Sequence, residues 1–386
     1  MSGRPAIPDK IKMRLWLLAG GRCQYEGCNE PLWRDDLTFA QMNRAYIAHI
    51  IDVKPQTHRY NSELSPRLAS DISNLMLLCD THHRLIDHEE EQAHTVDRLM
   101  EMKAQHEARI ELLTSLKDDK KSHVLLYGAN IGKQSASLSW KKAAQAMIPL
   151  RYPAEPRAIE LSLRNSAFED HSSEYWTIER RNLQSNLNAS LRSRIVSGDV
   201  EHLSIFALAP QPLLIELGRL LSDIPAAEVY QRHREPPDWR WQETPDGFAF
   251  HIEEPAETHA TVALNLSLSA TIENARVTNT LGEGDLSIWR MTIPEPNNDF
   301  LRSRDQLRLF RQEFRILLDR IKARHGQDVV LHVFPAVPVS VAVEIGRVWM
   351  PKADLPFCIY DQNRKLGGFT KAFLFGDDRP KGIVSC

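Results

Sequence analysis

Two stretches near the start of the chain carry hydrophobic residues at helical spacing. The first covers residues 8–19 and ends at a glycine pair, and its apolar face consists of Ile11, Leu15 and Leu18. The second runs from about residue 96 to 116, and its apolar face consists of Leu99, Met102, His106, Ile110 and Leu113. This spacing predicts two amphipathic helices. Residues 22–90 between them follow no period and are rich in Cys, His, Asn and Asp.

The pattern changes after the polar run Lys117–Lys121, which predicts a hinge. Beyond it, short apolar runs alternate with longer helical patterns, as in α/β proteins. The most apolar run, Val329–Val343, contains His332 and two prolines. It is shorter than a membrane span requires and predicts a buried strand, a turn and the start of a helix. We therefore expect one domain at residues 1–120 and a second at residues 122–386.

The second domain contains an internal repeat. Residues 203–230 (LSIFALAPQPLLIELGRLLSDIPAAEVY) align with residues 331–360 (LHVFPAVPVSVAVEIGRVWMPKADLPFCIY). The aligned pairs are Phe206/Phe334, Pro210/Pro338, Glu216/Glu344, Gly218/Gly346, Arg219/Arg347 and, after a two-residue insertion, Tyr230/Tyr360. Each copy follows a helix-like stretch, and further upstream an apolar strand. We expect two related strand–helix–strand–helix halves, at about residues 122–250 and 251–386, packed as one pseudo-symmetric body.

Composition narrows the class of protein. The 386 residues are 42% hydrophobic and 26% charged with a net charge of -3, which is ordinary for a soluble globular protein and excludes a bulk polycation. Residues 1–10 include two prolines and no apolar segment of a signal peptide, and five cysteines at uneven spacing make a poor disulfide framework. These features predict a cytoplasmic protein with no membrane partner.

The cysteines and histidines concentrate in the first 120 residues. Cys23 and Cys28 form one close pair, and Cys79 and His82 form a second. Two short-spaced pairs of soft ligands predict a closed, four-ligand structural Zn²⁺ site. The alternative is buried cysteines with a histidine nearby by chance.

A further set of residues runs through the same segment. His49 lies in YIAHIID, Asn74 in SDISNLMLLC, and His83 follows His82 in HHRLID. This order, with the Cys pairs, resembles the HNH endonucleases. The resemblance implies an α+β domain with the ββα-metal fold, in which a divalent cation such as Mg²⁺ assists phosphodiester cleavage.

The resemblance and the chemistry of the reaction suggest a role for each residue. His49 is the candidate general base, and His83 the candidate ligand of the catalytic cation. Asn74 either orients the loop at His49 or contacts the metal. Many family members have Asp immediately before the first histidine, where this chain has Ala48. We therefore expect another carboxylate in the metal shell, from Asp52, Asp71 or Asp87, with Asp87 also open to being a surface residue.

Double-stranded DNA is the substrate that the HNH resemblance implies. Residues 1–120 hold 16 basic and 19 acidic side chains, so bulk charge cannot supply the affinity, although a few phosphate contacts can contribute. The candidate contacts are Arg22, Arg34, Arg44, Lys54, Arg59, Arg67 and Arg84.

The duplicated part of the chain resembles the SAVED domain, a fused pair of CARF-like, Rossmann-like units. The domain order resembles the HNH–SAVED effector nucleases of CBASS anti-phage systems, which implies activation by a cyclic dinucleotide and self-association into a homo-oligomer. Loops at the carboxyl ends of parallel strands commonly bind ligands. The candidate ligand-binding residues are Asn130, Lys133, Ser135, Tyr152, Pro210 and Pro338. Trp176, Trp239 and Trp241 can stack on bases or pack in the core.

We therefore expect a ligand-gated, metal-dependent DNA endonuclease. Two alternatives remain. The first is a constitutive HNH restriction-type enzyme whose C-terminal half reads a DNA sequence or modification. The second is a non-enzymatic zinc module that binds DNA or a partner protein.

Overall fold

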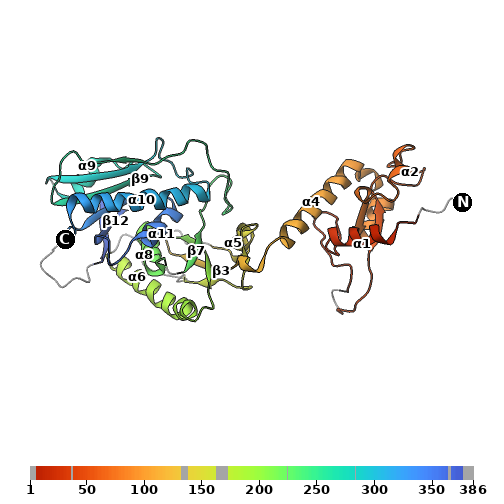
Figure 1. Cartoon of the computed structure of the whole chain (residues 1–386), viewed down its shortest axis with the longest axis horizontal. Coiled ribbons are helices and arrows are strands. Elements are labelled where there is room, and N and C mark those ends of the chain that lie inside the picture. Colours follow the sequence, from red (N-terminus) through yellow and green to blue (C-terminus); the bar gives the residue numbers. More distant parts are fainter. Residues whose placement is uncertain are drawn as a thin grey trace. The chain divides into compact units, whose positions relative to one another are not determined.

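The computed structural model divides the chain into two compact units, Met1–Asp118 and Asp119–Cys386 (Figure 1). It describes residues 6–35, 38–131, 138–161, 173–223, 225–282, 284–363 and 367–376. In this part of the chain, no helix has the length and the apolar character that a membrane crossing requires. Each unit is described separately below.

The smaller unit contains a two-stranded sheet and several helices. Strands β1 (Tyr46–His49) and β2 (Leu75–Leu78) pair antiparallel, with His49 opposite Leu75. The helices are α1 (Asp9–Leu18), α2 (Leu64–Leu68), η1 (Ile72–Asn74), α3 (Asp80–Arg84), η2 (Leu85–Glu89), η3 (Glu91–Ala93) and α4 (Val96–Thr114). The two amphipathic helices predicted from spacing are thus present as α1 and α4. The segment without a period folds as strand, strand and helix, in the order β1, β2, α3.

One hydrophobic core holds the smaller unit together. All four residues of β2 are buried, and Leu15 of α1 and Leu99 of α4 belong to the same cluster. His106 on the predicted apolar face of α4 is also buried, and its Nε2 lies 2.9 Å from the carbonyl of Ala19. This hydrogen bond ties α4 to the end of α1 and satisfies a polar group that burial would otherwise penalise.

The larger unit begins with the first of two sheets. Its strand order is β4 (Tyr152–Pro153), β3 (Lys121–Gly128), β6 (His202–Leu208) and β7 (Ala226–Val229), and β5 (Ile159–Glu160) also pairs with β3. All of these pairings are parallel. The helices of this half are α5 (Trp140–Met147), α6 (Ser173–Leu187), η5 (Asn188–Arg192), α7 (Ser193–Val196) and α8 (Gln211–Leu221), and η4 (Asp118–Lys120) precedes β3.

The second sheet has six strands, in the order β13 (Gly368–Phe375), β12 (Phe357–Asn363), β11 (Leu331–Ala336), β9 (Thr261–Ser267), β10 (Leu286–Thr292) and β8 (His251–Glu253). The four central strands are parallel, and the two edge strands are antiparallel to their neighbours. The helices are α9 (Asn274–Leu281), α10 (Arg304–His325) and α11 (Val339–Val348). The apolar run Val329–Val343 forms a buried strand, a turn and a helix start, as its pattern predicts.

A single large core joins the two sheets. It contains Leu125 of β3, Leu264 of β9 and side chains of α6, α8, α10 and α11. Successive residues of a strand point to opposite faces, so Val124 and Leu126 pack with α5 in one smaller cluster, and Ala263 packs with α9 in another. The larger unit is therefore layered as helix, sheet, helices, sheet, helix, and it is a duplicated α/β body.

The internal repeat places α8 against α11. A Cβ atom built on Gly218 of α8 would lie 1.9 Å from the backbone oxygen of Val343, and one built on Gly346 of α11 would lie 1.9 Å from the backbone oxygen of Ile215. These positions are equivalent in the two copies, so the two helices cross at a pseudo-two-fold axis. Only glycine permits so close an approach of two backbones, and this explains the glycine of the repeated motif.

The other repeated residues support the same packing. Glu216 and Glu344 are buried, and each lies beside the arginine three residues on, Arg219 or Arg347. Phe206 stacks on Tyr230 and Phe334 stacks on Tyr360, both with ring centroids 4.4 Å apart. Burial raises the pKa of Glu344, whereas Arg219 and Arg180 hold the pKa of Glu216 below its ordinary value despite its burial. The two copies thus share positions but not electrostatic surroundings.

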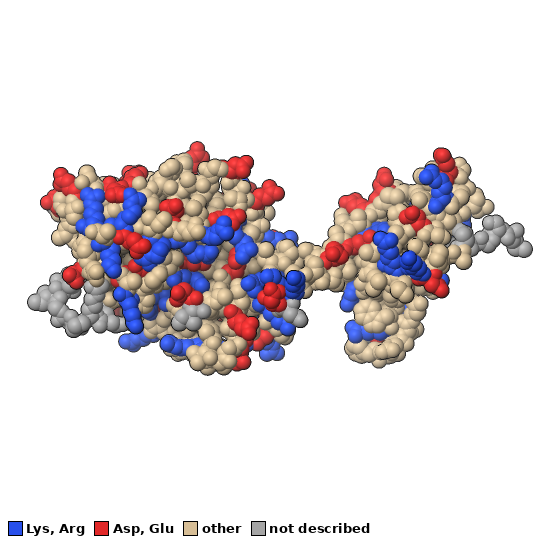
Figure 2. Space-filling model, viewed as in Figure 1, with Lys and Arg blue, Asp and Glu red and all other residues tan. Residues whose placement is uncertain are grey.

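Basic side chains gather over α10 on the face of the larger unit drawn in Figure 2. Three of them pair with carboxylates of other elements: Arg304 with Glu228, Arg311 with Glu344, and Arg315 with Asp354. This band is therefore largely an ion-paired surface that fastens α10 to its neighbours.

Substituting Gly218 tests the helix crossing. We expect Gly218→Ala to force α8 and α11 apart and to cost about 3 kcal/mol or more, at the upper end of overpacking losses. This corresponds to a fall of roughly 6 °C or more in the melting temperature of the larger unit. Gly284→Ala is the matched control, because a Cβ there meets no atom within 4 Å. Equal melting temperatures for both variants would contradict the crossing.

Candidate functional site

The four predicted zinc ligands lie together in the smaller unit. One ligand atom from each of Cys23, Cys28, Cys79 and His82 falls within 4.8 Å of all the others. The fold brings them together because Gln24, between the first two cysteines, bonds to β2 through both its backbone and its side chain. The backbone N–H of Gln24 donates to the carbonyl of Leu77 (2.9 Å), and its Oε1 accepts from the N–H of Leu77 (2.7 Å). Cys79 then follows β2 directly and begins α3, which carries His82.

The donor set fits zinc. Nδ1 of His82 lies 3.1 Å from Sγ of Cys79 and 3.8 Å from Sγ of Cys23. Three thiols and one imidazole are a typical structural zinc set. A hydrogen bond from the Cys23 thiol lowers the pKa of Cys79 to about 4, and the same contact, with burial, raises the pKa of Cys23. This contact favours the thiolate form of Cys79, the form that binds a metal.

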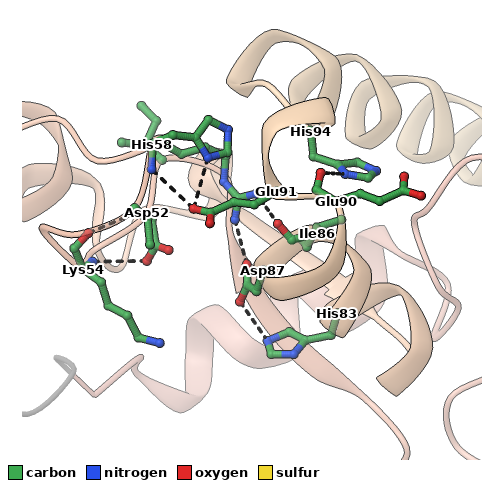
Figure 3. A network of polar contacts seen from close by, with 12 residues as sticks. Asp52, Lys54, His58, His83, Ile86, Asp87, Glu90, Glu91 and His94 are labelled. Atoms are coloured by element: carbon green, nitrogen blue, oxygen red, sulfur yellow. Dashed lines mark hydrogen bonds and ion pairs between the residues drawn. The ribbon is translucent and has the colours of Figure 1, made fainter.

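Two residues that the sequence patterns did not single out, Tyr25 and His94, form a chain of contacts that begins at the ring of His82. The ring of Tyr25 stacks on that of His82, with centroids 4.1 Å apart and planes 16° apart. Its hydroxyl lies 3.0 Å from Nε2 of His94, whose Nδ1–H donates to the carbonyl of Glu90 (2.8 Å; Figure 3). Because Nδ1 of His94 carries the proton, Nε2 accepts from Tyr25. The position of Tyr25 inside the RCQYEGC knuckle is the one sequence signal that points to this role.

His49 lies at the end of β1 with one ring nitrogen fixed. It is buried, with 6% of its surface exposed, and Nε2 lies 3.0 Å from the carbonyl of Ala69. A carbonyl only accepts, so Nε2 carries the proton and Nδ1 has a free lone pair. Among the described residues, Nδ1 of His49 has no hydrogen-bond partner. An unpaired, buried imidazole nitrogen is a suitable proton acceptor for a reacting molecule.

Asn74 fixes the loop that follows His49. It is fully buried, its Oδ1 accepts from the N–H of Ile51 (2.7 Å), and its Nδ2 donates to the carbonyls of Ile51 (3.0 Å) and Leu68 (3.2 Å). Its backbone carbonyl also accepts from the N–H of Ile50. The amide is engaged on both sides, so in this geometry Asn74 orients the loop at His49, which is the first of the two roles considered for it.

His83 points away from the cysteine cluster. Its ring stacks on Tyr46 of β1, with centroids 5.0 Å apart, and its Nε2 lies 3.5 Å from a carboxylate oxygen of Asp87, one helical turn on (Figure 3). The adjacent histidines His82 and His83 of α3 therefore lie in two different surroundings. A carboxylate that accepts a hydrogen bond from one ring nitrogen of a histidine commonly orients the other ring nitrogen to bind a metal.

A buried arginine holds Asp87. Nη2 of Arg59 donates to Asp87 (2.7 Å) and its Nη1 donates to the carbonyl of Ile86 (2.8 Å). Arg59 has 3% of its surface exposed, so it is not available to phosphates, and its inclusion among the candidate DNA contacts is wrong. Because one oxygen of Asp87 is held by Arg59 and the other faces His83, Asp87 lies behind His83 as a positioning carboxylate.

The remaining carboxylates considered for the cation are engaged elsewhere. Asp71 is exposed and caps η1 by accepting from the backbone and side chain of Ser73, which holds its pKa below the ordinary value. Asp52 is buried and accepts from the N–H of Lys54 (3.2 Å; Figure 3). Within the described ranges, the cysteine cluster is the one place where three or more such ligand atoms converge.

The predicted ligand-binding residues of the larger unit fall into three groups. Lys133 and Ser135 lie outside the described residues. Asn130 follows the carboxyl end of β3, and its carbonyl accepts from the hydroxyl of Tyr175 (2.9 Å). Tyr152 pairs with Lys121 at the opposite end of β3, so the two do not share one site, and the grouping of Tyr152 with Asn130 is wrong.

The two prolines and two tryptophans occupy structural positions. Pro210 and Pro338 are buried and begin α8 and α11, because the ring of a proline fits the start of a helix. Trp176 and Trp239 are buried in the core and are not available to bases. The carboxyl ends of β6 and β11 nevertheless lie close together. The N–H of Val337, directly after β11, donates to Oε1 of Gln211 (3.2 Å), which begins α8 after β6.

Zinc analysis tests the cysteine cluster. We expect the purified chain to carry about one zinc ion and Cys79→Ala to lose it, since three ligands do not complete a tetrahedral structural site. Loss of zinc should unfold the smaller unit, because metal binding contributes directly to its folding free energy. Cys358→Ala, in the larger unit, is the control and should keep full zinc content. Mass spectrometry of the metal and limited proteolysis measure both effects, and a zinc-free parent chain that resists proteolysis would contradict the assignment.

Comparisons with known proteins concern mainly the larger unit. Solved structures of Cap4 SAVED/CARF-domain receptors are similar over much of the chain. The Acinetobacter baumannii receptor with the cyclic trinucleotide 3'3'3'-cAAA is 14% identical (TM-score 0.42), with 82% of this chain and 67% of the receptor covered. The Moraxella osloensis receptor is 13% identical (TM-score 0.37), with 82% and 66% covered. No curated protein matches.

The family comparison is specific. Residues 181–375 match the model of the SMODS-associated and fused to various effectors sensor domain, and this range includes both copies of the internal repeat. It begins within α6 and ends with β13, so it covers the helix crossing, the six-stranded sheet, and strands β6 and β7 of the first sheet. The chain belongs to the SAVED family of sensor domains.

Proposed function

We propose that this protein is a metal-dependent DNA endonuclease of anti-phage defence, switched on when a cyclic oligonucleotide binds its SAVED domain. The observation that carries the proposal is His49, whose buried Nδ1 has no partner among the described residues while Nε2 is fixed on Ala69. This histidine ends β1 of a ββα arrangement whose helix carries His83. The unit that contains it precedes a sensor domain on the same chain.

In the proposed reaction, Nδ1 of His49 accepts a proton from water while the water oxygen attacks the phosphorus. The bond from phosphorus to the leaving oxygen breaks, and that oxygen takes up a proton. A divalent cation, when bound, neutralises charge on the phosphorane and on the leaving oxygen. His83 would hold the cation, with Asp87 and Arg59 fixing its ring, and Asn74 would keep the His49 loop in place. The cysteine cluster would hold zinc for structure.

The sensor side of the proposal rests on the family and on the duplication. Gln211, which follows β6, and Val337, which follows β11, are joined by a hydrogen bond, so the equivalent strand ends of the two copies lie together. This arrangement suits a ligand with repeated phosphates and bases. Two solved relatives carry cyclic trinucleotides, and the resemblance to CBASS effectors implies a cyclic dinucleotide. Both are cyclic oligonucleotides. Binding would change how protomers associate and bring two nuclease units together, so that both strands of duplex DNA are cut.

A ligand panel tests the gating. We expect plasmid DNA in Mg²⁺ to remain intact with the chain alone and to be degraded when one member of a panel of cyclic di- and trinucleotides is added. The expected increase is at least about tenfold, the ratio of a coupling free energy of 1.4 kcal/mol. Gel electrophoresis measures cleavage, and light scattering measures the expected homo-oligomer. Cutting at defined sites without any nucleotide would favour a constitutive restriction-type enzyme.

Substituting His49 tests the chemistry under the activating condition. We expect His49→Ala to reduce the cleavage rate about 10²- to 10⁴-fold, the usual contribution of a general base, while zinc content and melting temperature stay near those of the parent. His88→Ala, an exposed histidine of the same unit, is the matched control and should cut normally. If both variants keep defence activity in cells while Cys79→Ala loses it, the smaller unit is a non-enzymatic zinc module.

A further inference from the structure

The seven basic residues predicted to contact DNA differ in whether their charged groups already have partners. A charged group that is already bonded gains less from a phosphate, because the existing contact must be given up. Five of the seven are engaged in this way: Arg22 donates to the carbonyl of Asn29, Arg34 has a partner in the structure, Arg44 pairs with Glu30, Arg59 with Asp87, and Arg84 with Asp80.

The other two, Lys54 and Arg67, have free charged groups. Both side chains are exposed, and among the described residues neither the ammonium of Lys54 nor the guanidinium of Arg67 has a hydrogen bond or an ion pair. Figure 3 shows the side chain of Lys54 extending away from the polar network. Such groups can bind phosphates and release counterions from DNA without losing a contact within the protein.

Both residues lie on the connection between β1 and β2, and their backbones are held in place. Oδ1 of Asp52 accepts from the N–H of Lys54 (3.2 Å), and the carbonyl of Lys54 accepts from the N–H (3.3 Å) and the hydroxyl (3.0 Å) of Thr57. Arg67 lies in the last turn of α2. The two cations are therefore presented by an ordered turn and a helix.

One hydrogen bond joins that turn to α2. The hydroxyl of the buried Ser65 donates to the carbonyl of Asp52 (2.6 Å), and each of these residues lies two positions before one of the cations. Two residues extend at most about 7 Å, so the Cα atoms of Lys54 and Arg67 lie at most about 22 Å apart. This is less than one turn of duplex DNA, about 34 Å, so one duplex can contact both.

The same segment holds the candidate general base. Nε2 of His49 is bonded to the carbonyl of Ala69, two residues beyond Arg67, and Asn74 donates to the carbonyl of Leu68 between them. Lys54 follows His49 by five residues, which extend at most about 18 Å. Both cations therefore lie within one turn of duplex DNA from His49.

We propose that Lys54 and Arg67 form a two-point phosphate contact that holds duplex DNA beside His49. This inference rests on the proposed nuclease function and names the residues that hold its substrate. Residues 1–120 contain 16 basic and 19 acidic side chains, so binding depends on individual contacts and not on bulk charge. Phosphate contacts carry no sequence information, so the expected binding is independent of sequence.

Fluorescence anisotropy with a labelled 30-base-pair duplex tests the proposal. The full chain carries His49→Ala to exclude cleavage, and Kd is measured at 50–200 mM salt in Mg²⁺ with no nucleotide, because both cations are exposed in the chain as described. We expect Lys54→Gln with Arg67→Gln to raise Kd at least about tenfold at 50 mM salt and to lower the salt slope of log Kd by about two, one for each phosphate contact. Each single variant should lower the slope by about one.

A matched control separates these contacts from bulk charge. Lys10→Gln with Arg14→Gln also removes one lysine and one arginine that are exposed and have no partner among the described residues, but these lie on α1. Their Kd and salt slope should stay near those of the parent. Lys54→Arg with Arg67→Lys keeps both charges and should keep the slope. All variants should keep their zinc content and melting temperature, which excludes unfolding as the cause of weaker binding.

Three results would overturn the proposal: no binding by the parent at 50 mM salt, a parental Kd and slope in the Lys54→Gln, Arg67→Gln double variant, or an equal loss in the α1 control. A double variant that binds DNA normally but changes self-association would assign the two residues to a protein contact instead. Because binding is read without cleavage, a chain that binds through Lys54 and Arg67 but cuts DNA under no condition would count against the proposed function alone.

Discussion

The contact between α8 and α11 determines the architecture of the sensor unit. Where Gly218 and Gly346 face each other's helix, no side chain separates the backbones, so the two halves of the duplication are held at a fixed distance and angle. The buried glutamates at 216 and 344 lie two residues from these glycines and are neutralised by arginines. Because one hydrophobic core surrounds this crossing and reaches both sheets, the strand ends on either side keep a constant relation to each other.

The smaller unit depends on a different constraint, the convergence of three sulfurs and one imidazole. A core of this size is marginal, and the ligand cluster fastens the knuckle, β2 and α3, which are distant in sequence. His82 and His83 are adjacent, so whatever fixes His82 also sets the direction of His83. The orientation of His83, the candidate cation ligand, therefore depends on the cysteine cluster. It also depends on Tyr25, which stacks on His82, and on His94, which is hydrogen-bonded to Tyr25.

The helices, the internal repeat and the two close pairs of metal ligands could be predicted from the sequence. Spacing predicted α1, α4 and the repeat, and the two close pairs predicted the four residues that the structure brings together. Features that depend on three-dimensional surroundings were not predictable. Arg59 resembles any surface arginine until its burial beside Asp87 is known, and Pro210 and Pro338 stand out in the repeat although their role is to begin helices. Tyr152 is the first residue of the short edge strand β4, and only the register of that strand shows that it lies at the far end of β3 from Asn130.

The fused duplication gives this protein a freedom that a symmetric dimer lacks. In a dimer of identical chains, every substitution alters both halves of a shared site at once. Here the two copies are separate stretches of one chain, and they have already diverged: Glu216 accepts from Arg219, Arg180 and Gln184, whereas Glu344 relies on Arg311 and a longer contact to Arg347. Each half can therefore evolve its own contacts, so the proposed cyclic ligand would be read as an ordered sequence of chemical groups and not only as a symmetric shape.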